Sequence, residues 1–308
     1  MKAVILDSDS LGEGVDLSPI KNQVGELVCY PLTSPNQVDE RIQNADVVIT
    51  NKVVLNEASL KKAEKLKLVC VLATGMNNID LKAAEKLGIP VKNVEAYGTP
   101  SVVQHTLMMM LSLATKIPVM QKRMAAGDWQ KSPLFTLLDP PTFQLEGKRL
   151  VIVGSGELGQ AVKKQAEALG MRVSFSARPG KTDDSRPSFD ELLPEADVIS
   201  FHCPLTEETK GLLNRQNIKH CRPHTLVINN ARGGVANEHD VLDALRKGQI
   251  GGYATDVLPQ EPPKDGHPLL DALNEPLNLI VTPHNAWTSP EARQRIIELT
   301  ADNISALT

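Results

Sequence analysis

The sequence predicts an α/β protein made of two units, each built on a mostly parallel sheet. Strand-like apolar segments alternate with helix-like segments along all 308 residues, which is the pattern of strands joined by crossover helices. The first third and the stretch from residue 149 onward each supply their own series of strands. A chain of this length also suits two domains of ordinary size better than one large core.

Composition and charge indicate a soluble globular protein. Hydrophobic residues make up 41% of the chain and charged residues 23%, a balance typical of this class. The net charge of −4 gives no electrostatic reason to expect nucleic acid or an anionic membrane as a partner. The most apolar run, LMMMLSLA, is far shorter than the ~20 residues that a membrane span needs. We therefore expect a buried helix there.

Cysteine usage and the amino terminus favour the cytoplasm. The cysteines are scattered, with no CxxC pair and no zinc-like spacing, at Cys29, Cys70, Cys203 and Cys221. We expect free thiols in a reducing compartment and no metal site. The first residues, MKAVILDSDS, enter a strand directly and carry no signal-peptide pattern.

The elements of the first third follow from its apolar pattern. Strands are expected at residues 3–8, 26–31, 46–50, 67–72 and 89–93, with helical patterns between them such as 34–45 and 56–66. A long helix then starts near Thr99, the expected N-cap, with Pro100 as its first helical residue. Apolar residues recur at helical spacing to its end, and Pro118 predicts a kink.

The second series of strands follows a Pro-rich linker at residues 137–148. Its strands are expected at residues 149–154, 172–176, 197–203, 225–231, 251–257 and 277–283. Helices separate most of them, and a final helix from Ser289 closes the chain.

A glycine-rich turn, G-S-G-E-L-G, holds Gly154, Gly156 and Gly159. A GxGxxG pattern alone is weak, but here an apolar strand ends at the first glycine and a helix begins at once. The first glycine permits the tight turn, the second lets backbone approach a pyrophosphate, and the third packs helix on strand. The helix N-terminus offers free N–H groups to phosphates. The turn predicts a dinucleotide site.

The end of the next strand bears on which dinucleotide is bound. NAD-binding units carry an acidic residue about 20 positions after the glycines, for the ribose 2′-hydroxyl. Here Ala177 and Arg178 occupy the strand tip, and no Asp or Glu follows until Asp183. An arginine can pair with a 2′-phosphate. We expect NADP(H) or NAD(H) as cofactor, with NADP(H) slightly favoured; the alternative is that Arg178 is only a solvated surface side chain.

Three later segments place a charged or titratable residue just beyond a buried strand: Arg232, Glu261 and His284. Ligands of open α/β sheets bind beyond the carboxyl ends of the strands, so these side chains can converge on a nicotinamide. Each has an alternative. Arg232 could be structural, Glu261 a solvated loop carboxylate, and His284 an interior histidine.

Four motifs in order carry a family resemblance: G-S-G-E-L-G (154–159), N-A-R-G-G (230–234), D-V-L-P-Q-E-P-P (256–263) and P-H-N-A-W (283–287). ATGMNNID, GTPSVVQHT and GDW in the earlier part fit the same pattern. Together they resemble the D-isomer-specific 2-hydroxyacid dehydrogenase family over nearly the whole chain. SVVQHT and H-x-A-W look most like its glycerate dehydrogenase, or hydroxypyruvate reductase, branch.

The resemblance implies two Rossmann-like, doubly wound domains with a cleft between them. Residues 1–99 plus 284–308 would form a flavodoxin-like substrate-binding domain, and residues 100–283 an inserted NAD(P)-binding domain. Arg232 would bind the carboxylate and carbonyl of a 2-keto acid. His284, held by Glu261, would give a proton in reduction and take it back in oxidation. The chemistry agrees, because an imidazolium and a guanidinium stabilise the negative charge that hydride addition builds on oxygen.

The resemblance also implies contacts. Substrate would meet Ala73, Thr74, Gly75, Met76, Arg232 and His284. Cofactor would meet Thr74, Val103, Glu157, Leu158, Cys203, Asn230, Ala231 and Asp256, besides the three glycines and the Ala177–Arg178 tip. Asp256 has the alternative of a strand-end cap. The departure from the commoner family pattern is Ala177, which stands where an acid is usual and puts strict NAD dependence in doubt.

The function expected is hydride transfer between a nicotinamide cofactor and a small D-2-hydroxy acid or 2-keto acid, most simply glycerate/hydroxypyruvate or glyoxylate. One alternative is another 2-keto acid, such as pyruvate or a larger one. Another is a dinucleotide-sensing protein without turnover, because one fold serves many functions. Family members are usually dimers through the cofactor domain, so a homodimer is expected, with the helix from Thr99 and the loop holding Phe135 and Phe143 as interface candidates.

Overall fold

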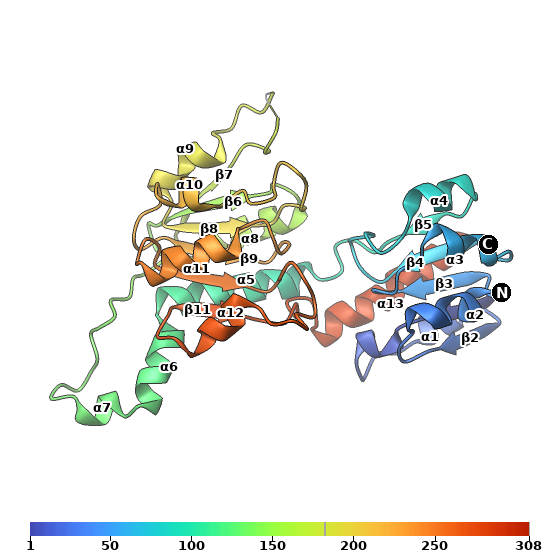
Figure 1. The fold of residues 1–308 in the computed structure, drawn as a ribbon, viewed down its shortest axis with the longest axis horizontal. Helices are drawn as coiled ribbons and strands as arrows, with labels where there is room; N and C mark the ends of the chain where they lie inside the picture. Colours follow the sequence, from blue (N-terminus) through green and yellow to red (C-terminus); the bar gives the residue numbers. More distant parts are fainter. Residues whose placement is uncertain (182, 308) are drawn as a thin grey trace. The chain divides into compact units, whose positions relative to one another are not determined.

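A computed structural model describes residues 1–181 and 183–307. The chain divides into two compact units, one of Met1–Gly98 with Trp287–Thr308 and one of Thr99–Ala286 (Figure 1). The predicted boundaries, 99/100 and 283/284, lie close to these. His284 itself falls in the second unit, together with the strand that precedes it.

The first unit is a parallel sheet in the order β2-β1-β3-β4-β5. Its strands are β1 Lys2–Ile5, β2 Glu26–Cys29, β3 Val47–Thr50, β4 Leu68–Val71 and β5 Val91–Lys92. Each lies within or across a predicted strand segment. The order 2-1-3-4-5 is the flavodoxin-like one, so the fold expected for this unit is confirmed.

Side chains alternate between the two faces of this sheet, and helices cover both. Val4, Val48 and Val69 pack with α2, α3 and α4, whereas Ile5, Ile49 and Cys70 pack with α1 and the C-terminal helix α13. The helices are η1 Ser8–Leu11, α1 Ser18–Lys21, η2 Pro35–Gln37, α2 Val38–Ile42, α3 Glu57–Lys62, α4 Leu81–Lys86 and α13 Pro290–Ser305. The N-terminal and C-terminal ends of the chain thus share one core.

The second unit is also a parallel sheet, in the order β11-β10-β9-β8-β6-β7. Its strands are β6 Arg149–Val153, β7 Arg172–Phe175, β8 Val198–Phe201, β9 Leu226–Asn229, β10 Gly252–Thr255 and β11 Leu279–Val281. The direction of winding reverses between β6 and β8, which pair with Val151 opposite Ile199. A ligand site is expected at such a switch point.

Helices cover both faces of this sheet too. Leu150, Ile152 and Val198 face α5 and α8, and Val151, Ile199 and Phe201 face α9 to α12. These helices are α5 Thr99–Ala114, α8 Glu157–Ala168, α9 Phe189–Leu192, η3 Leu193–Glu195, α10 Arg215–Ile218, α11 Glu238–Arg246, α12 Pro268–Asp271 and η4 Ala272–Asn274.

The predicted long kinked helix is instead three helices, α5, α6 (Ile117–Ala125) and α7 (Asp128–Lys131). Lys116 adopts a left-handed conformation with φ 57°, and α5 and α6 meet there at a bend of 59°. Pro118 lies in the first turn of α6, where proline is favoured. It therefore starts a helix rather than kinking one. No single helix of the described residues is long and apolar enough to cross a membrane; only α5 and α6 together pass by length and composition.

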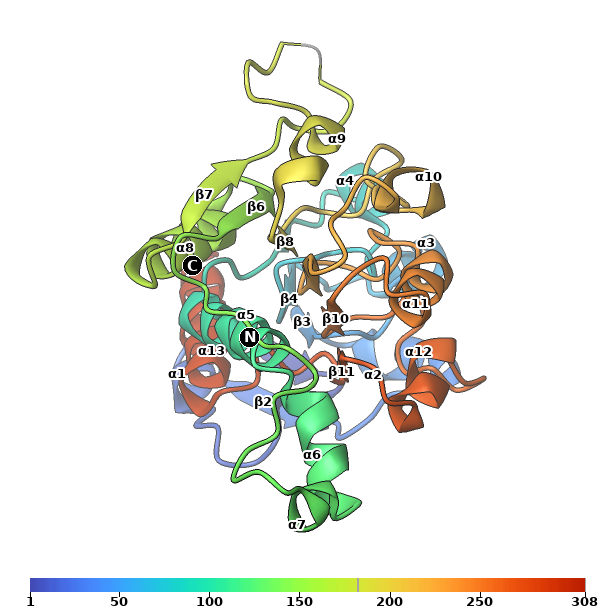
Figure 2. The same cartoon turned by 90° about the vertical axis from the view of Figure 1, so that its left-hand side faces the viewer.

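Helices α6 and α7, with the segment 132–141 that follows them, extend away from the sheet of the second unit (Figures 1 and 2). We call these residues, 117–141, the arm. The Pro-rich stretch of residues 137–148, which begins within the arm, is an internal connection of this unit and leads to β6. Phe143 packs against the core beneath α5, whereas Phe135 on the arm is 90% exposed.

Candidate active site

The glycine turn after β6 has the geometry that its three glycines predict. Gly154 has φ 109°, and a Cβ there would lie 2.5 Å from the carbonyl oxygen of His202. A Cβ on Gly159 would lie 2.0 Å from the carbonyl oxygen of Gly154. The first glycine thus allows the turn to pass the end of β8, and the third lets α8 pack on β6.

Gly156 differs from the other two because a Cβ there would meet no atom within 4 Å. Its backbone is the N-cap of α8, and no N-cap side chain accepts the N–H groups of the first turn. Glu157 and Leu158 follow directly in that first turn. A helix N-terminus with open space before it suits an anion. These residues therefore fit the pyrophosphate of a dinucleotide.

Ala177 and Arg178 follow β7, and Asp184 reaches them from the loop beyond. The Asp184 carboxylate accepts the backbone N–H of Arg178 at 2.8 Å. It is also paired with Arg186, whose Nε lies 2.8 Å away. This guanidinium holds the pKa of Asp184 well below its usual range. The side chain of Arg178 is exposed.

Arg232 follows β9 in a turn that the side chain of Asn229 holds. The Asn229 amide donates to the carbonyl of Arg232 at 2.9 Å, and its oxygen accepts the N–H of Ala231 at 3.1 Å. Asn229 is fully buried. The Arg232 guanidinium is exposed and donates to the carbonyl of Ala231. The backbone that carries this guanidinium is therefore fixed from within the sheet.

Gly233 brings the Arg232 turn against the loop that follows β10. A Cβ on Gly233 would lie 2.0 Å from the carbonyl carbon of Leu258 and 2.2 Å from the nitrogen of Pro259. No other residue fits without moving backbone. Glu261 lies in the same loop and accepts the N–H of Leu258 at 2.8 Å.

Glu261 also holds His284, whose Nδ1 lies 2.6 Å from a Glu261 carboxylate oxygen. A carboxylate only accepts hydrogen bonds, so Nδ1 carries a proton and donates it. This leaves Nε2 of His284 as the nitrogen that can exchange a proton with another group. The two side chains are 31% and 33% exposed, so the pair is open to a small molecule. The strands that lead to Arg232, Glu261 and His284 are neighbours in the sheet.

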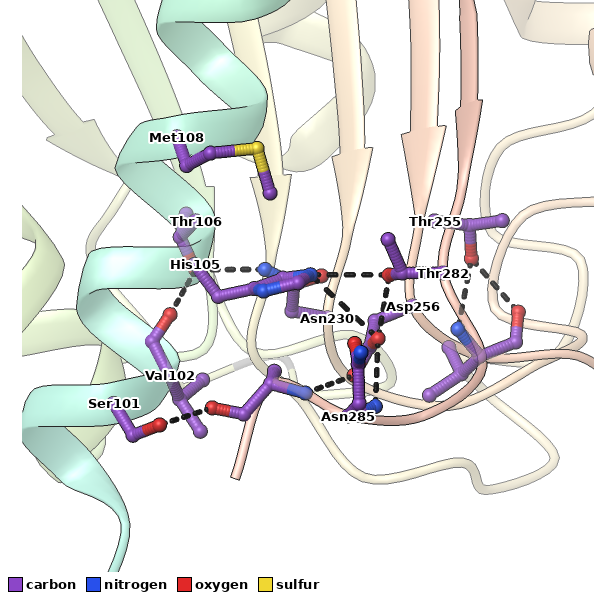
Figure 3. A network of polar contacts seen from close by, with 12 residues as sticks. Ser101, Val102, His105, Thr106, Met108, Asn230, Thr255, Asp256, Thr282 and Asn285 are labelled. Atoms are coloured by element: carbon purple, nitrogen blue, oxygen red, sulfur yellow. Dashed lines mark hydrogen bonds and ion pairs between the residues drawn. The ribbon is translucent and has the colours of Figure 1, made fainter. Parts of the chain in front are cut away.

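Asp256 lies 2% exposed at the end of β10 and acts as a strand-end cap. Its carboxylate accepts the N–H of Asn285 and of Ala286, both at 2.9 Å, and the Thr282 hydroxyl at 2.5 Å (Figure 3). The alternative foreseen for this residue is thus the arrangement found. It holds the loop that carries His284.

The other predicted cofactor residues are largely buried. Burial raises the pKa of the Cys203 thiol to about 11, so it is unreactive. Ala231 is buried, and Val103 packs in the core between α5 and the sheet. The Asn230 amide donates to the Thr106 hydroxyl at 2.8 Å.

The predicted substrate residues Ala73, Thr74, Gly75 and Met76 follow β4 in the first unit. The Thr74 hydroxyl donates to the carbonyl of Val94 at 3.2 Å, and Met76 packs partly on the unit's core. Their loop is thus held at the carboxyl end of its own sheet, where ligands of such sheets bind. Within residues 1–181 and 183–307, no three His, Cys, Asp or Glu side chains are grouped to hold a metal ion.

Several contacts that shape the site were not predicted from the sequence. Asn229 and Gly233 flank Arg232 in the motif N-N-A-R-G-G, where a polar residue at a strand end and a paired glycine are the only signals. Thr282 and His105 meet at 3.0 Å although 177 positions separate them. No local pattern could have paired them.

Known proteins similar to this chain belong to one family of dehydrogenases. The family model for the NAD binding domain of D-isomer specific 2-hydroxyacid dehydrogenases matches residues 107–286. A glycerate dehydrogenase of Methylorubrum extorquens is 39% identical over 99% of this chain and 95% of its own length. A hydroxypyruvate reductase of Blautia hydrogenotrophica is 36% identical over 99% of this chain and 96% of its own. The crystal structure of D-lactate dehydrogenase from Aquifex aeolicus, complexed with NAD and lactic acid, matches with a TM-score of 0.80 and 26% identity over 99% of this chain and 95% of that one.

The fold, the glycine turn and these relatives define a nicotinamide-dependent oxidoreductase. The chain belongs to the D-isomer specific 2-hydroxyacid dehydrogenase family. The resemblance seen in its motifs is confirmed, including the similarity to glycerate dehydrogenases and hydroxypyruvate reductases.

Proposed function

We propose that this enzyme reduces a small 2-keto acid, hydroxypyruvate or glyoxylate, and oxidises the corresponding D-2-hydroxy acid in reverse. The observation that carries the proposal is the hydrogen bond of 2.6 Å between Glu261 and His284. The loop that holds Glu261 also packs directly against the Arg232 turn. The proton donor follows β11 and the fixed cation follows β9, and the Glu261 loop follows β10, the strand between them. Reduction of a ketone needs these two groups, a general acid and a cation that stabilises the negative charge on oxygen.

His284 is the acid and base in this proposal. Glu261 accepts a hydrogen bond from the Nδ1–H of His284, so Nε2 is the nitrogen left for the substrate. In reduction the imidazolium gives its Nε2 proton to the carbonyl oxygen, and in oxidation neutral Nε2 receives the hydroxyl proton. Glu261 orients the ring and stabilises the imidazolium that exists between turnovers.

Arg232 binds the substrate carboxylate and stabilises the charge on the reacting oxygen. A guanidinium is planar and grips two oxygens at once, which a lysine ammonium cannot do. Asn229 and Gly233 fix the backbone on either side of it. Backbone groups of residues 73–76, at the carboxyl end of the first unit's own sheet, are proposed to bind substrate as well.

Gly156 and the first turn of α8 would hold the pyrophosphate of the dinucleotide. When bound, the dinucleotide supplies the hydride in reduction and accepts it in oxidation. Asn230, Ala231 and Cys203 line the nicotinamide side. At the β7 tip, the exposed Arg178, with Ala177 in the position where an acid is usual, favours NADP(H) slightly over NAD(H).

A panel of 2-keto acids, run with NADPH and with NADH, tests the function. We expect loss of nicotinamide absorbance, with kcat/KM for hydroxypyruvate or glyoxylate about tenfold or more above that for pyruvate or a branched 2-keto acid. A larger keto acid as the best substrate contradicts the proposed substrate. No absorbance loss with any keto acid favours a dinucleotide sensor instead.

A homodimer formed through the second unit is also proposed. Large apolar side chains are exposed along α5 and the arm: Met108, Leu111, Ile117, Trp129, Leu134, Phe135 and Leu138. Such a patch on a monomer is unfavourable in water and suits burial against a second copy. Sedimentation equilibrium giving the mass of one chain contradicts the dimer. We further propose the cytoplasm as its location, since all four cysteines are free thiols.

A further inference from the structure

The backbone of His284 is unusual and needs support. Its φ is 53°, a left-handed conformation that a residue with a β-carbon rarely adopts. Its N–H is shared between the carbonyls of Asp256, at 2.8 Å, and Thr282, at 3.0 Å. The next two N–H groups, of Asn285 and Ala286, go to the Asp256 carboxylate. A conformation of this kind persists only where its surroundings hold it.

Helix α5 holds this loop on both sides of His284. The Ser101 hydroxyl donates to the carbonyl of Ala286 at 2.6 Å, and Nε2 of His105 lies 3.0 Å from the Thr282 hydroxyl. Ser101 and His105 are four positions apart and so lie on one helix face. Thr282 and Ala286 each stand two positions from His284. Figure 3 shows Ser101 and His105 on the same side of α5, facing this loop.

The direction of these hydrogen bonds follows from counting protons. The Thr282 hydroxyl lies 2.5 Å from an oxygen of Asp256, and that carboxylate can only accept. Thr282 therefore donates its single proton to Asp256 and must accept from His105. Nε2 of His105 thus carries a proton. Burial lowers the pKa of His105, against an opposing effect of Asp256, so the ring acts as a neutral donor.

We propose that His105 is a positioning residue, whose Nε2–H orients the Thr282 hydroxyl and, through it, the Asp256 carboxylate that holds His284. The proposal rests on the catalytic role proposed above for His284. The same helix contacts the dinucleotide turn, because the Thr99 hydroxyl donates to Glu157 at 2.6 Å. Helix α5 therefore joins the cofactor side and the proton-transfer side of the second unit.

Two substitutions at His105 separate hydrogen bonding from packing. His105→Leu fills the 15%-exposed site without a donor, and we expect kcat to fall about tenfold. His105→Gln keeps an N–H at the same reach and should recover most of that loss. Dinucleotide affinity, measured by nicotinamide fluorescence, should stay within about twofold of the wild-type value in both His105 variants, because residue 105 does not belong to the glycine turn. His220→Leu, the same change at an exposed histidine, is the control.

Thr282→Val tests the relay from its other end, because valine keeps the shape and loses the hydroxyl. It should lower kcat as His105→Leu does, and the double variant should lose no more than either single one. Amide hydrogen exchange at Asn285 and Ala286 should be faster than in the wild type in His105→Leu, in Thr282→Val and in the double variant. Equal losses in the Gln and Leu variants, or additive losses in the double variant, contradict the proposal and indicate packing alone.

His284→Ala in the same assay separates the two claims. If it abolishes turnover while His105→Leu keeps the wild-type kcat, the positioning role is wrong and the proposed function stands. If His284→Ala turns over normally, the catalytic role proposed for His284 falls, and the positioning role falls with it.

Discussion

At the scale of single residues, Arg178 is the side chain on which cofactor choice depends. Asp184, an acid that reaches the β7 tip, is already bound to Arg186 and to the Arg178 N–H. It cannot act as a free acceptor for a ribose hydroxyl without giving up these bonds. A 2′-phosphate would instead find the exposed Arg178 guanidinium, with Ala177 in the position where an acid is usual.

Arg178→Ala should therefore raise the KM for NADPH about tenfold, the value of one charge-assisted hydrogen bond, and leave that for NADH within about twofold. Arg172→Ala, which removes an exposed arginine at the opposite end of the same strand, is the matched control. Steady-state kinetics with both dinucleotides decide the matter. NADH used about ten times more efficiently than NADPH by the unaltered enzyme contradicts the preference.

Asp256 shows, at the same scale, what the sequence alone cannot predict. The pattern identified Asp256 as important but left open whether it serves the ligand or the backbone. The structure commits both carboxylate oxygens to backbone N–H groups of the His284 loop. That partnership spans about 30 positions of chain, and the partners are N–H groups that every residue but proline has, so no sequence pattern reveals it.

At the scale of elements, two glycines of the turn between β6 and α8 have different roles, one in packing and one in the proposed binding of the dinucleotide. Gly159 is needed for packing, since its missing Cβ would overlap the Gly154 carbonyl. Gly156 is not needed for packing, since a Cβ there meets open space and its φ of −73° suits any residue. The open space is where a pyrophosphate would lie.

Gly159→Ala should accordingly destabilise the fold by about 1–3 kcal/mol, the usual cost of overpacking. Gly156→Ala should change stability by less than about 0.5 kcal/mol, yet weaken dinucleotide binding about tenfold by filling the approach to the helix N-terminus. Urea unfolding and a nicotinamide-fluorescence titration measure the two effects. Wild-type dinucleotide affinity in Gly156→Ala would show that the phosphates bind elsewhere.

The strands were predicted well, because each is recognised from a short apolar segment of the sequence itself. Each predicted strand has its counterpart among β1 to β11, because buried parallel strands are apolar throughout. The helix from Thr99 was predicted too long. Its break at Lys116 depends on a left-handed residue and on the Lys116 ammonium reaching the carbonyl of Gly251 at 2.6 Å. A contact between distant parts of the chain decided where the helix ends.

At the scale of the whole molecule, the residues proposed for proton transfer and anion binding lie in one of the two units. The proposed acid, its carboxylate partner and the proposed anion-binding arginine all belong to the second unit, Thr99–Ala286. The motifs predict which residues these are. They could not foretell the buried support from Asn229, Gly233, Thr282 and His105, which depends on the folded arrangement of neighbouring strands and α5.

Turnover by His284→Ala and Arg232→Ala, measured as nicotinamide oxidation with the best keto acid, tests the central claim most directly. We expect each to lower kcat/KM by about a hundredfold or more, with dinucleotide affinity unchanged. Near-wild-type turnover in either variant would mean that these strand ends do not carry the chemistry.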